Sequence, residues 1–301
     1  MRAGSRRFVV ANEPGDSVGF CGNARRVSGL TLNVLVILSC GGFRTEVAGM
    51  GWQRYVALGD SFTEGIGDPR PNGRDRGWAD RVAEVLATDD RQVRYANLAI
   101  RGRRLAQIVQ EQVPPARELT PDLVSFAGGV NDALRRQWDI AALSKHLETG
   151  IAALSSTGAD VVIVTYGRPS SRSRLMGPVE GRLAQYRDVT YEVAGRYGCR
   201  VVDFWDHAVF DDPRFWSQDR LHLNSVGHQR VAMAVLESLG REAGDWTRPL
   251  PHVRPLSPVV KVGRDVTWAS KHLAPWIGRR VTGRSSGDGV CAKRPVLEPV
   301  L

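Results

Sequence analysis

Short apolar runs alternate with longer amphipathic segments through the middle of the chain. Five runs are short, apolar and mostly β-branched, as is typical of strands buried on both faces of a sheet; they are 55–58, 93–98, 123–126, 161–165 and 201–204. Four segments carry apolar residues at helical spacing, namely 78–87, 140–155, 179–197 and 225–239. Strands that alternate with helices predict an α/β fold, with a five-stranded parallel sheet between two helical layers.

The two ends of the chain differ from this central region in charge and in pattern. The sequence has 301 residues and a formal net charge of +9, but residues 50–245 are close to neutral, so the basic excess lies in the ends. We expect a leader at 1–49 outside the fold, a main domain at 50–245, and a basic C-terminal tail at 246–301 with one helix near 265–276. A basic tail can bind anionic surfaces weakly, but a solvated tail is the simpler interpretation.

The apolar run at 30–40 comes nearest to a membrane span, and it is shorter than the ~18 residues that a span needs. Two arginines precede it, as in a signal peptide, although Glu13 and Asp16 lie upstream and Asn33 interrupts it. A start at Met50, just before the first strand, is the other interpretation. A cytoplasmic location is favoured if the chain starts at Met50, and export is the alternative if 30–40 is a signal segment.

Three polar stretches directly follow predicted strands, where ligand sites form in open parallel sheets. Ser61 stands in the first, on a strand-to-helix turn, as a candidate nucleophile or a helix N-cap. Gly102 follows the second strand and allows either a close backbone approach or an ordinary loop. Asn131 follows the third strand, as a side-chain donor or a turn residue.

A fourth stretch precedes the last predicted helix and contains Asp219 and His222. A histidine with an acidic residue three positions earlier suits a general base and the carboxylate that orients it, although a loop histidine and a capping aspartate are the alternatives. His228 nearby raises the alternative of a metal cluster. That alternative is disfavoured, because no second ligand pair with metal spacing is present. The four cysteines show neither zinc spacing nor a disulfide framework.

The combination of these features is more specific than any one of them. Acyl transfer needs a nucleophile, a base, an orienting carboxylate and donors to an oxyanion, and the four stretches supply all of them. With the motifs GDSFTEG, NLAIRG, GGVND and DRLH, the chain resembles the SGNH hydrolase superfamily of GDSL-type lipases and esterases, in particular its single-domain actinobacterial-type members. The resemblance spans about 54–240. Phe62 stands where the name-giving motif has leucine, at a position that we expect to be a packing one.

The resemblance implies a flavodoxin-like α/β/α sandwich at 50–245 and a serine hydrolase that cleaves acyl esters through an acyl-enzyme. Ser61 is then the nucleophile, His222 the base and Asp219 its orienting carboxylate. The N–H groups of Ser61 and Gly102 and the side chain of Asn131 form the oxyanion hole. This chemistry needs no metal and no organic cofactor.

The substrate is left open between a small-molecule, a carbohydrate and a lipid ester, and so is the oligomeric state. Neither a nucleic-acid partner nor a stable membrane span is expected. An acyltransferase with the same acyl-enzyme and a non-catalytic binding protein on this fold are the alternative functions. Arginines in the two predicted rim loops could favour an anionic or sugar-borne ester or could be solvated; they are Arg70, Arg74, Arg168, Arg172 and Arg174.

Overall fold

The computed structural model describes residues 51–90, 92–169, 177–253, 267–268, 270–271 and 285–300. The predicted leader at 1–49 lies outside these residues. Most of the helix predicted near 265–276 also lies outside them, so the interpretation of both segments stays a prediction.

The sheet has six strands in the order β5-β4-β3-β1-β2-β6. Their bounds are Arg54–Leu58 (β1), Arg94–Asn97 (β2), Leu123–Phe126 (β3), Asp160–Val164 (β4), Arg200–Val202 (β5) and Arg294–Pro299 (β6). The first five strands are parallel and occupy the five predicted apolar runs. Their order is the flavodoxin-like one, in which the chain reverses direction across the sheet between β1 and β3.

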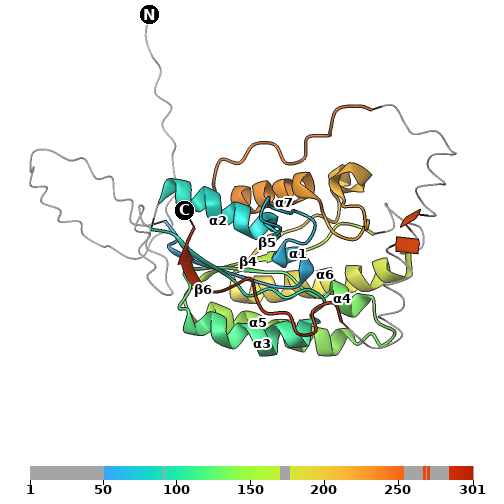
Figure 1. Ribbon diagram of the computed structural model, residues 1–301. Helices are drawn as coiled ribbons and strands as arrows, with labels where there is room; N and C mark the ends of the chain where they lie inside the picture. The colour runs from blue at the N-terminus through green and yellow to red at the C-terminus, as the bar shows by residue number, and fades with distance from the viewer. Residues whose placement is uncertain are drawn as a thin grey trace, which may run out of the picture. The chain divides into compact units, whose positions relative to one another are not determined.

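Helices cover both faces of this sheet, which confirms the three-layer prediction (Figure 1). One layer contains α2 (Gly77–Asp89) and α7 (Ser225–Ser238); the other contains α3 (Leu105–Glu118), α5 (Ile140–Ser155) and α6 (Gly177–Tyr197). The side chains of β1 alternate between the two cores. Tyr55 and Ala57 pack in the core that includes α2 and α7 residues, whereas Val56 and Leu58 pack in the core that includes α3 and α5 residues.

Helix α3 is one element that the apolar pattern did not predict. It contains Pro114 and Pro115, which cannot donate a backbone hydrogen bond and therefore weaken any helical signal in the sequence. The helix forms because its inner face is apolar, with Leu105, Ile108 and Val113 buried against the sheet and α5. Tertiary burial thus outweighs the local cost of the prolines.

Strand β6 is the other unpredicted element, so the expected count of five strands is one short. It pairs antiparallel with β2, with Tyr95 opposite Glu298 and Asn97 opposite Arg294. Pro295 and Pro299 are tolerated because β6 is an edge strand. The sheet therefore takes in residues beyond 245. Among the helices that the structure describes, none has the length and apolar character to span a bilayer.

Candidate active site

The first motif places Ser61 at the start of helix α1 (Ser61–Glu64), immediately after β1. Asp60 is the N-cap of this helix, and its side chain accepts a hydrogen bond from the N–H of Phe62 at 3.1 Å. The capping interpretation of Ser61 is therefore wrong, because the preceding residue caps the helix. The Ser61 hydroxyl instead lies 2.9 Å from Nε2 of His222.

His222 lies in a loop that is closed by local hydrogen bonds just before α7. Trp216 and Leu223 form an isolated β-bridge across its base, and Asn224 caps α7 with its side chain. Inside the loop, Oδ1 of Asp219 accepts the N–H of His222 at 3.0 Å. The spacing of three residues between Asp219 and His222 thus creates a turn that holds both side chains on one side of the loop.

The carboxylate and the imidazole are joined directly, with Oδ2 of Asp219 2.6 Å from Nδ1 of His222. Burial by itself raises the pKa of Asp219, but the hydrogen bonds and the charge of His222 outweigh it and hold that pKa well below its usual range. An ionised Asp219 favours a proton on Nδ1, so a neutral His222 presents its Nε2 lone pair to Ser61. The side chains of His222 and Asp219 remain 26% and 24% exposed, which leaves this site open to solvent.

Gly102 lies beyond the end of β2, in a tight turn with a φ of +76°, a conformation that favours glycine. The preceding N–H, of Arg101, donates to Oε2 of Glu64 at 2.6 Å, and the two side chains form an ion pair. Among the described residues, no acceptor is hydrogen-bonded to the N–H of Ser61 or of Gly102. Within the part of the chain that the structure describes, both N–H groups are thus without an acceptor.

Asn131 lies in the short helix α4 (Val130–Ala133), directly after β3. Its Nδ2 donates to Oδ2 of Asp60 at 2.9 Å and to the carbonyl of Arg103 at 3.1 Å. These bonds hold the amide beside the start of α1 and occupy its two protons. Asn131 can contact an oxyanion only if one of these bonds is shared or released.

Three acidic residues of the site had no assigned role in the sequence interpretation. Asp60 joins α1 to Asn131, and burial raises the pKa of this carboxyl to about 6. Glu64 joins α1 to the Gly102 turn. Asp132 accepts the N–H of Leu105 at 2.9 Å and so ties α4 to the start of α3. All three residues belong to the quoted motifs, but their hydrogen-bond partners lie far away in the sequence. Only the structure shows which groups these carboxylates bind.

His228 is a buried structural residue and not part of a metal cluster with His222. Its Nδ1 accepts the N–H of Trp78 at 3.2 Å, and its Nε2 lies 3.2 Å from the carbonyl of Ile66. Burial lowers the pKa of His228 to about 4, so the ring is neutral at physiological pH. With both ring nitrogens engaged, His228 links α7 to α2. Phe62 packs against the same ring and against Trp78, as expected of a packing position.

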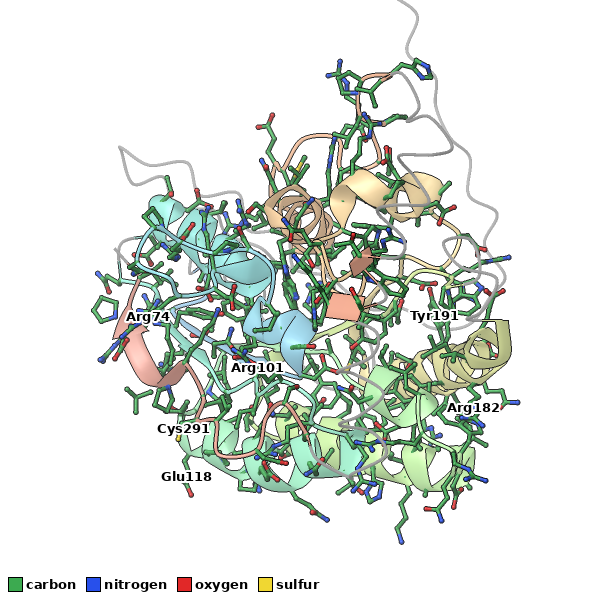
Figure 2. All side chains as sticks on the ribbon, turned by 45° about the vertical axis from the view of Figure 1, so that its right-hand side comes forward. Arg74, Arg101, Glu118, Arg182, Tyr191 and Cys291 are labelled. Atoms are coloured by element: carbon green, nitrogen blue, oxygen red, sulfur yellow. The ribbon has the colours of Figure 1, made fainter. Side chains whose placement is uncertain are left out.

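The described rim arginines are mostly paired with acidic side chains. Arg70 forms an ion pair with Glu84 at 2.6 Å, and Arg168 pairs with Asp206. Arg74 is exposed and lies away from Arg101 and helix α1 in Figure 2. The other two rim candidates, Arg172 and Arg174, lie outside the described residues.

Trp268, in the C-terminal region, contacts the loop that carries Asp219 and His222. Its Nε1–H donates to the backbone carbonyl of Asp219 at 2.8 Å, and the Arg220 guanidinium lies 4.9 Å from its ring centre. Arg220 has a φ of +59°, which is uncommon for a residue with a side chain. Trp268 therefore covers the strained part of this loop.

Known proteins resemble this chain in sequence. The model of the GDSL-like lipase/acylhydrolase family matches residues 57–230. The chain is similar to an arylesterase of Vibrio mimicus, with 23% identity over 208 residues that cover 65% of this chain and 93% of the relative. The chain belongs to the GDSL-like lipase/acylhydrolase family, as the sequence motifs indicated. It is a carboxylic ester hydrolase of that family.

Solved structures share the fold. An α/β-hydrolase enzyme from the metagenome of Lake Arreo, Spain, has a TM-score of 0.53 and 24% identity, and the match covers 62% of this chain and 95% of that one. A lipase/acylhydrolase from Enterococcus faecalis has a TM-score of 0.51 and 22% identity, and the match covers 64% of this chain and 99% of that one. The matched part of this chain thus corresponds to nearly the whole of each neighbour.

Proposed function

We propose that the chain hydrolyses esters by two acyl transfers through a covalent intermediate on Ser61. The observation that carries the proposal is the linear arrangement of Ser61 Oγ, the His222 ring and the Asp219 carboxylate, joined at 2.9 and 2.6 Å. This is the geometry in which an imidazole can accept the hydroxyl proton while a fixed carboxylate stabilises the resulting charge. The first acyl transfer is from the ester to Ser61, and the second is from Ser61 to water.

Nε2 of His222 accepts and then returns a proton in each of the two transfers. Ser61 Oγ attacks the carbonyl carbon as its proton passes to Nε2 of His222, and the carbonyl oxygen becomes an oxyanion. When the tetrahedral intermediate collapses, the leaving alcohol takes that proton from Nε2 and the acyl-enzyme remains. A water molecule then gives a proton to Nε2 and attacks the acyl carbon, which releases the acid and returns the proton to Ser61.

The oxyanion would be held by the N–H groups of Ser61 and Gly102 and by the side chain of Asn131. Free, fixed N–H groups stabilise charge that exists only in the transition state and so lower the barrier rather than strengthen substrate binding. Asn131 enters this set when its amide shares a proton with the new anion. The partly exposed His222 side chain is open to water, which supports hydrolysis over transfer to another acceptor.

The substrate class that we propose is a neutral ester. Arg70 and Arg168 are neutralised by Glu84 and Asp206, so these described rim arginines are not available to recognise an anionic group. An anionic ester would also approach the ionised Asp219, which repels it.

This proposal predicts a preference between two matched substrates. The wild-type chain should hydrolyse p-nitrophenyl acetate with a higher kcat/KM than p-nitrophenyl hemisuccinate, which carries a carboxylate on the acyl group. The kcat/KM values for esters of graded acyl length and for acetylated sugars, measured alongside, show which acyl and alcohol groups the site accepts. A preference for the anionic ester would contradict the neutral-ester proposal, and a chain that hydrolyses none of the esters would contradict the proposed function.

The role of Asn131 predicts a loss in turnover rather than in binding. Asn131→Ala removes one oxyanion donor, which typically lowers kcat by about 10²- to 10³-fold with little change in KM. Because the variant also leaves Asp60 without this partner, the melting temperature is measured alongside the kinetics. A raised KM with kcat preserved would place Asn131 in substrate binding and overturn its assignment to the oxyanion hole.

A further inference from the structure

The C-terminal segment returns to the active site along the strand that leads into the oxyanion turn. Strand β6 pairs with β2, and the chain continues from β2 through residues 98–100 into the turn that contains Gly102. Residues 285–293, here named the C-terminal strap, precede β6 and run alongside this turn. Figure 2 shows Arg101 below helix α1 and Cys291 on the strap that passes beneath it. The family model ends at residue 230, so the strap lies beyond the residues it matches.

The backbone of the strap packs directly against the backbone of the Arg101–Gly102 turn. A Cβ placed on Gly287 would lie 2.0 Å from the carbonyl oxygen of Arg101, so the strap comes closer than any side chain would allow. On the opposite side, a Cβ placed on Gly102 would lie 2.3 Å from Oγ of Ser285. The two turns therefore fit together because each lacks a side chain at the point of contact.

The contacting part of the strap is itself a closed turn. The N–H of Ser285 donates to Oδ2 of Asp288 at 2.8 Å, and the N–H of Gly287 donates to Oγ of Ser285 at 3.2 Å. The N–H of Val290 donates to the carbonyl of Gly287 at 3.2 Å. These bonds define the shape of the turn that packs on Arg101.

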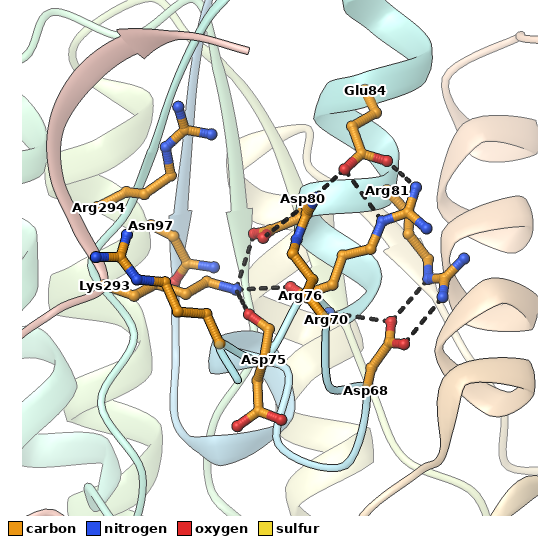
Figure 3. A network of polar contacts seen from close by, with 12 residues as sticks. Asp68, Arg70, Asp75, Arg76, Asp80, Arg81, Glu84, Asn97, Lys293 and Arg294 are labelled. Atoms are coloured by element: carbon orange, nitrogen blue, oxygen red, sulfur yellow. Dashed lines mark hydrogen bonds and ion pairs between the residues drawn. The ribbon is translucent and has the colours of Figure 1, made fainter. Parts of the chain in front are cut away.

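Lys293 anchors the other end of the strap inside the protein (Figure 3). Its ammonium group lies 2.9 Å from Oδ1 of Asp80 and donates to the carbonyls of Asp75 and Arg76 at 3.2 and 2.6 Å. The Lys293 side chain is only 18% exposed. A buried ammonium with three acceptors fixes the chain at that point, because leaving any of these groups unpaired is costly.

Two sets of contacts thus hold the Arg101–Gly102 turn from opposite sides. Glu64 holds the Arg101 N–H and guanidinium from helix α1, and Gly287 of the strap packs on the Arg101 carbonyl. The peptide unit whose carbonyl belongs to Arg101 is the one whose N–H belongs to Gly102. Any shift of that carbonyl therefore rotates the proposed oxyanion donor.

We propose that the C-terminal strap is a positioning element of the oxyanion hole, which sets the direction of the Gly102 N–H through the contact of Gly287 with Arg101. The proposal rests on the proposed function, in which that N–H binds the oxyanion. A strap with this role affects the transition state of every ester alike, because the oxyanion is common to all of them. A strap that only lines the pocket would affect long and short acyl chains differently.

Gly287→Ala in the full chain tests this proposal. The added methyl group displaces the strap from the Arg101 carbonyl, and because a misplacement of about 1 Å can cost about 10²-fold in rate, we expect kcat to fall by about 10- to 100-fold with little change in KM. The factor should be the same for p-nitrophenyl acetate and p-nitrophenyl butyrate. Gly195→Ala is the matched control, since a Cβ there meets nothing within 4 Å and the residue lies in α6, so its kinetics should equal those of the wild type.

A second variant releases the strap from its other end. Lys293→Gln removes the buried charge and should lower kcat for the two esters by a common factor, with circular dichroism to show that the variant is folded. A folded Gly287→Ala or Lys293→Gln variant with wild-type kcat, or a loss that depends on acyl length, would overturn the proposal. Ester hydrolysis by the wild type and labelling of Ser61 are measured separately, so failure of the strap and failure of the proposed function are distinguishable.

Discussion

Ser61→Ala should lower kcat/KM by about 10⁴-fold or more, because the nucleophile and its base act as one unit and neither works alone. The fold should be unaffected. Asp60 and not Ser61 caps helix α1, so the substitution removes one hydroxyl, whose contact is with Nε2 of His222. Hydrolysis of p-nitrophenyl acetate and the melting temperature, measured on the same preparation, check both expectations.

Ser225→Ala is the matched control for this variant. Ser225 is also the first residue of a helix, α7, and its loss should leave the hydrolytic rate close to that of the wild type. Retention of substantial activity by Ser61→Ala would show that another residue carries the acyl group. An equal loss in the two serine variants would show that the effect is structural.

Asp219→Asn should lower kcat by about 10³- to 10⁴-fold, between the effects of Asn131→Ala and Ser61→Ala. Oδ1 of Asp219 accepts backbone N–H groups of the loop at 2.9 and 3.0 Å, and an asparagine oxygen can keep these bonds. The amide nitrogen would then face Nδ1 of His222 and force the proton to Nε2. In that tautomer the ring points a proton at Ser61 and cannot accept one.

The pH dependence of wild-type stability follows from the lowered pKa of Asp219. A carboxylate whose folded pKa lies below its unfolded value stabilises the native state above the unfolded pKa, and that contribution is lost only as the pH falls through the folded pKa. Asp219→Asn has no carboxylate at this position, so its activity should stay low at every pH at which Asp219 of the wild type is ionised. Asp245→Asn, a change on an exposed loop, serves as the control and should retain full activity. A wild-type rate for Asp219→Asn would show that the carboxylate does not orient the base.

The sequence predicted the parts of the fold that depend on local apolar pattern. Each of the five parallel strands lies where one of the predicted apolar runs stands. Helix α3 and strand β6 were not predicted, for two different reasons. Pro114 and Pro115 weaken the helical signal of α3, whose stability comes from burial. Strand β6 is an exposed edge strand whose sequence has no alternation of apolar and polar residues.

In the candidate site, too, the residues in local motifs were predicted and the long-range contacts were not. Ser61, Asp219 and His222 were identified because each stands in a short motif at a strand end or helix start, and the fold brings them within hydrogen-bond distance. Glu64 acts on Arg101, which is 37 positions away, and Gly287 packs on the same residue from the C-terminal strap. Such contacts depend on how distant segments come together, and one sequence does not encode them in any local pattern.

The central claim is that Ser61 carries the acyl group, and covalent labelling tests it most directly. The full chain is treated with a fluorophosphonate, which reacts with an activated serine, and intact-mass and peptide mass spectrometry then locate the adduct. The account predicts one equivalent of label on Ser61, loss of activity in step with labelling, and no adduct in Ser61→Ala. An adduct on another residue, with activity still present in Ser61→Ala, would contradict it.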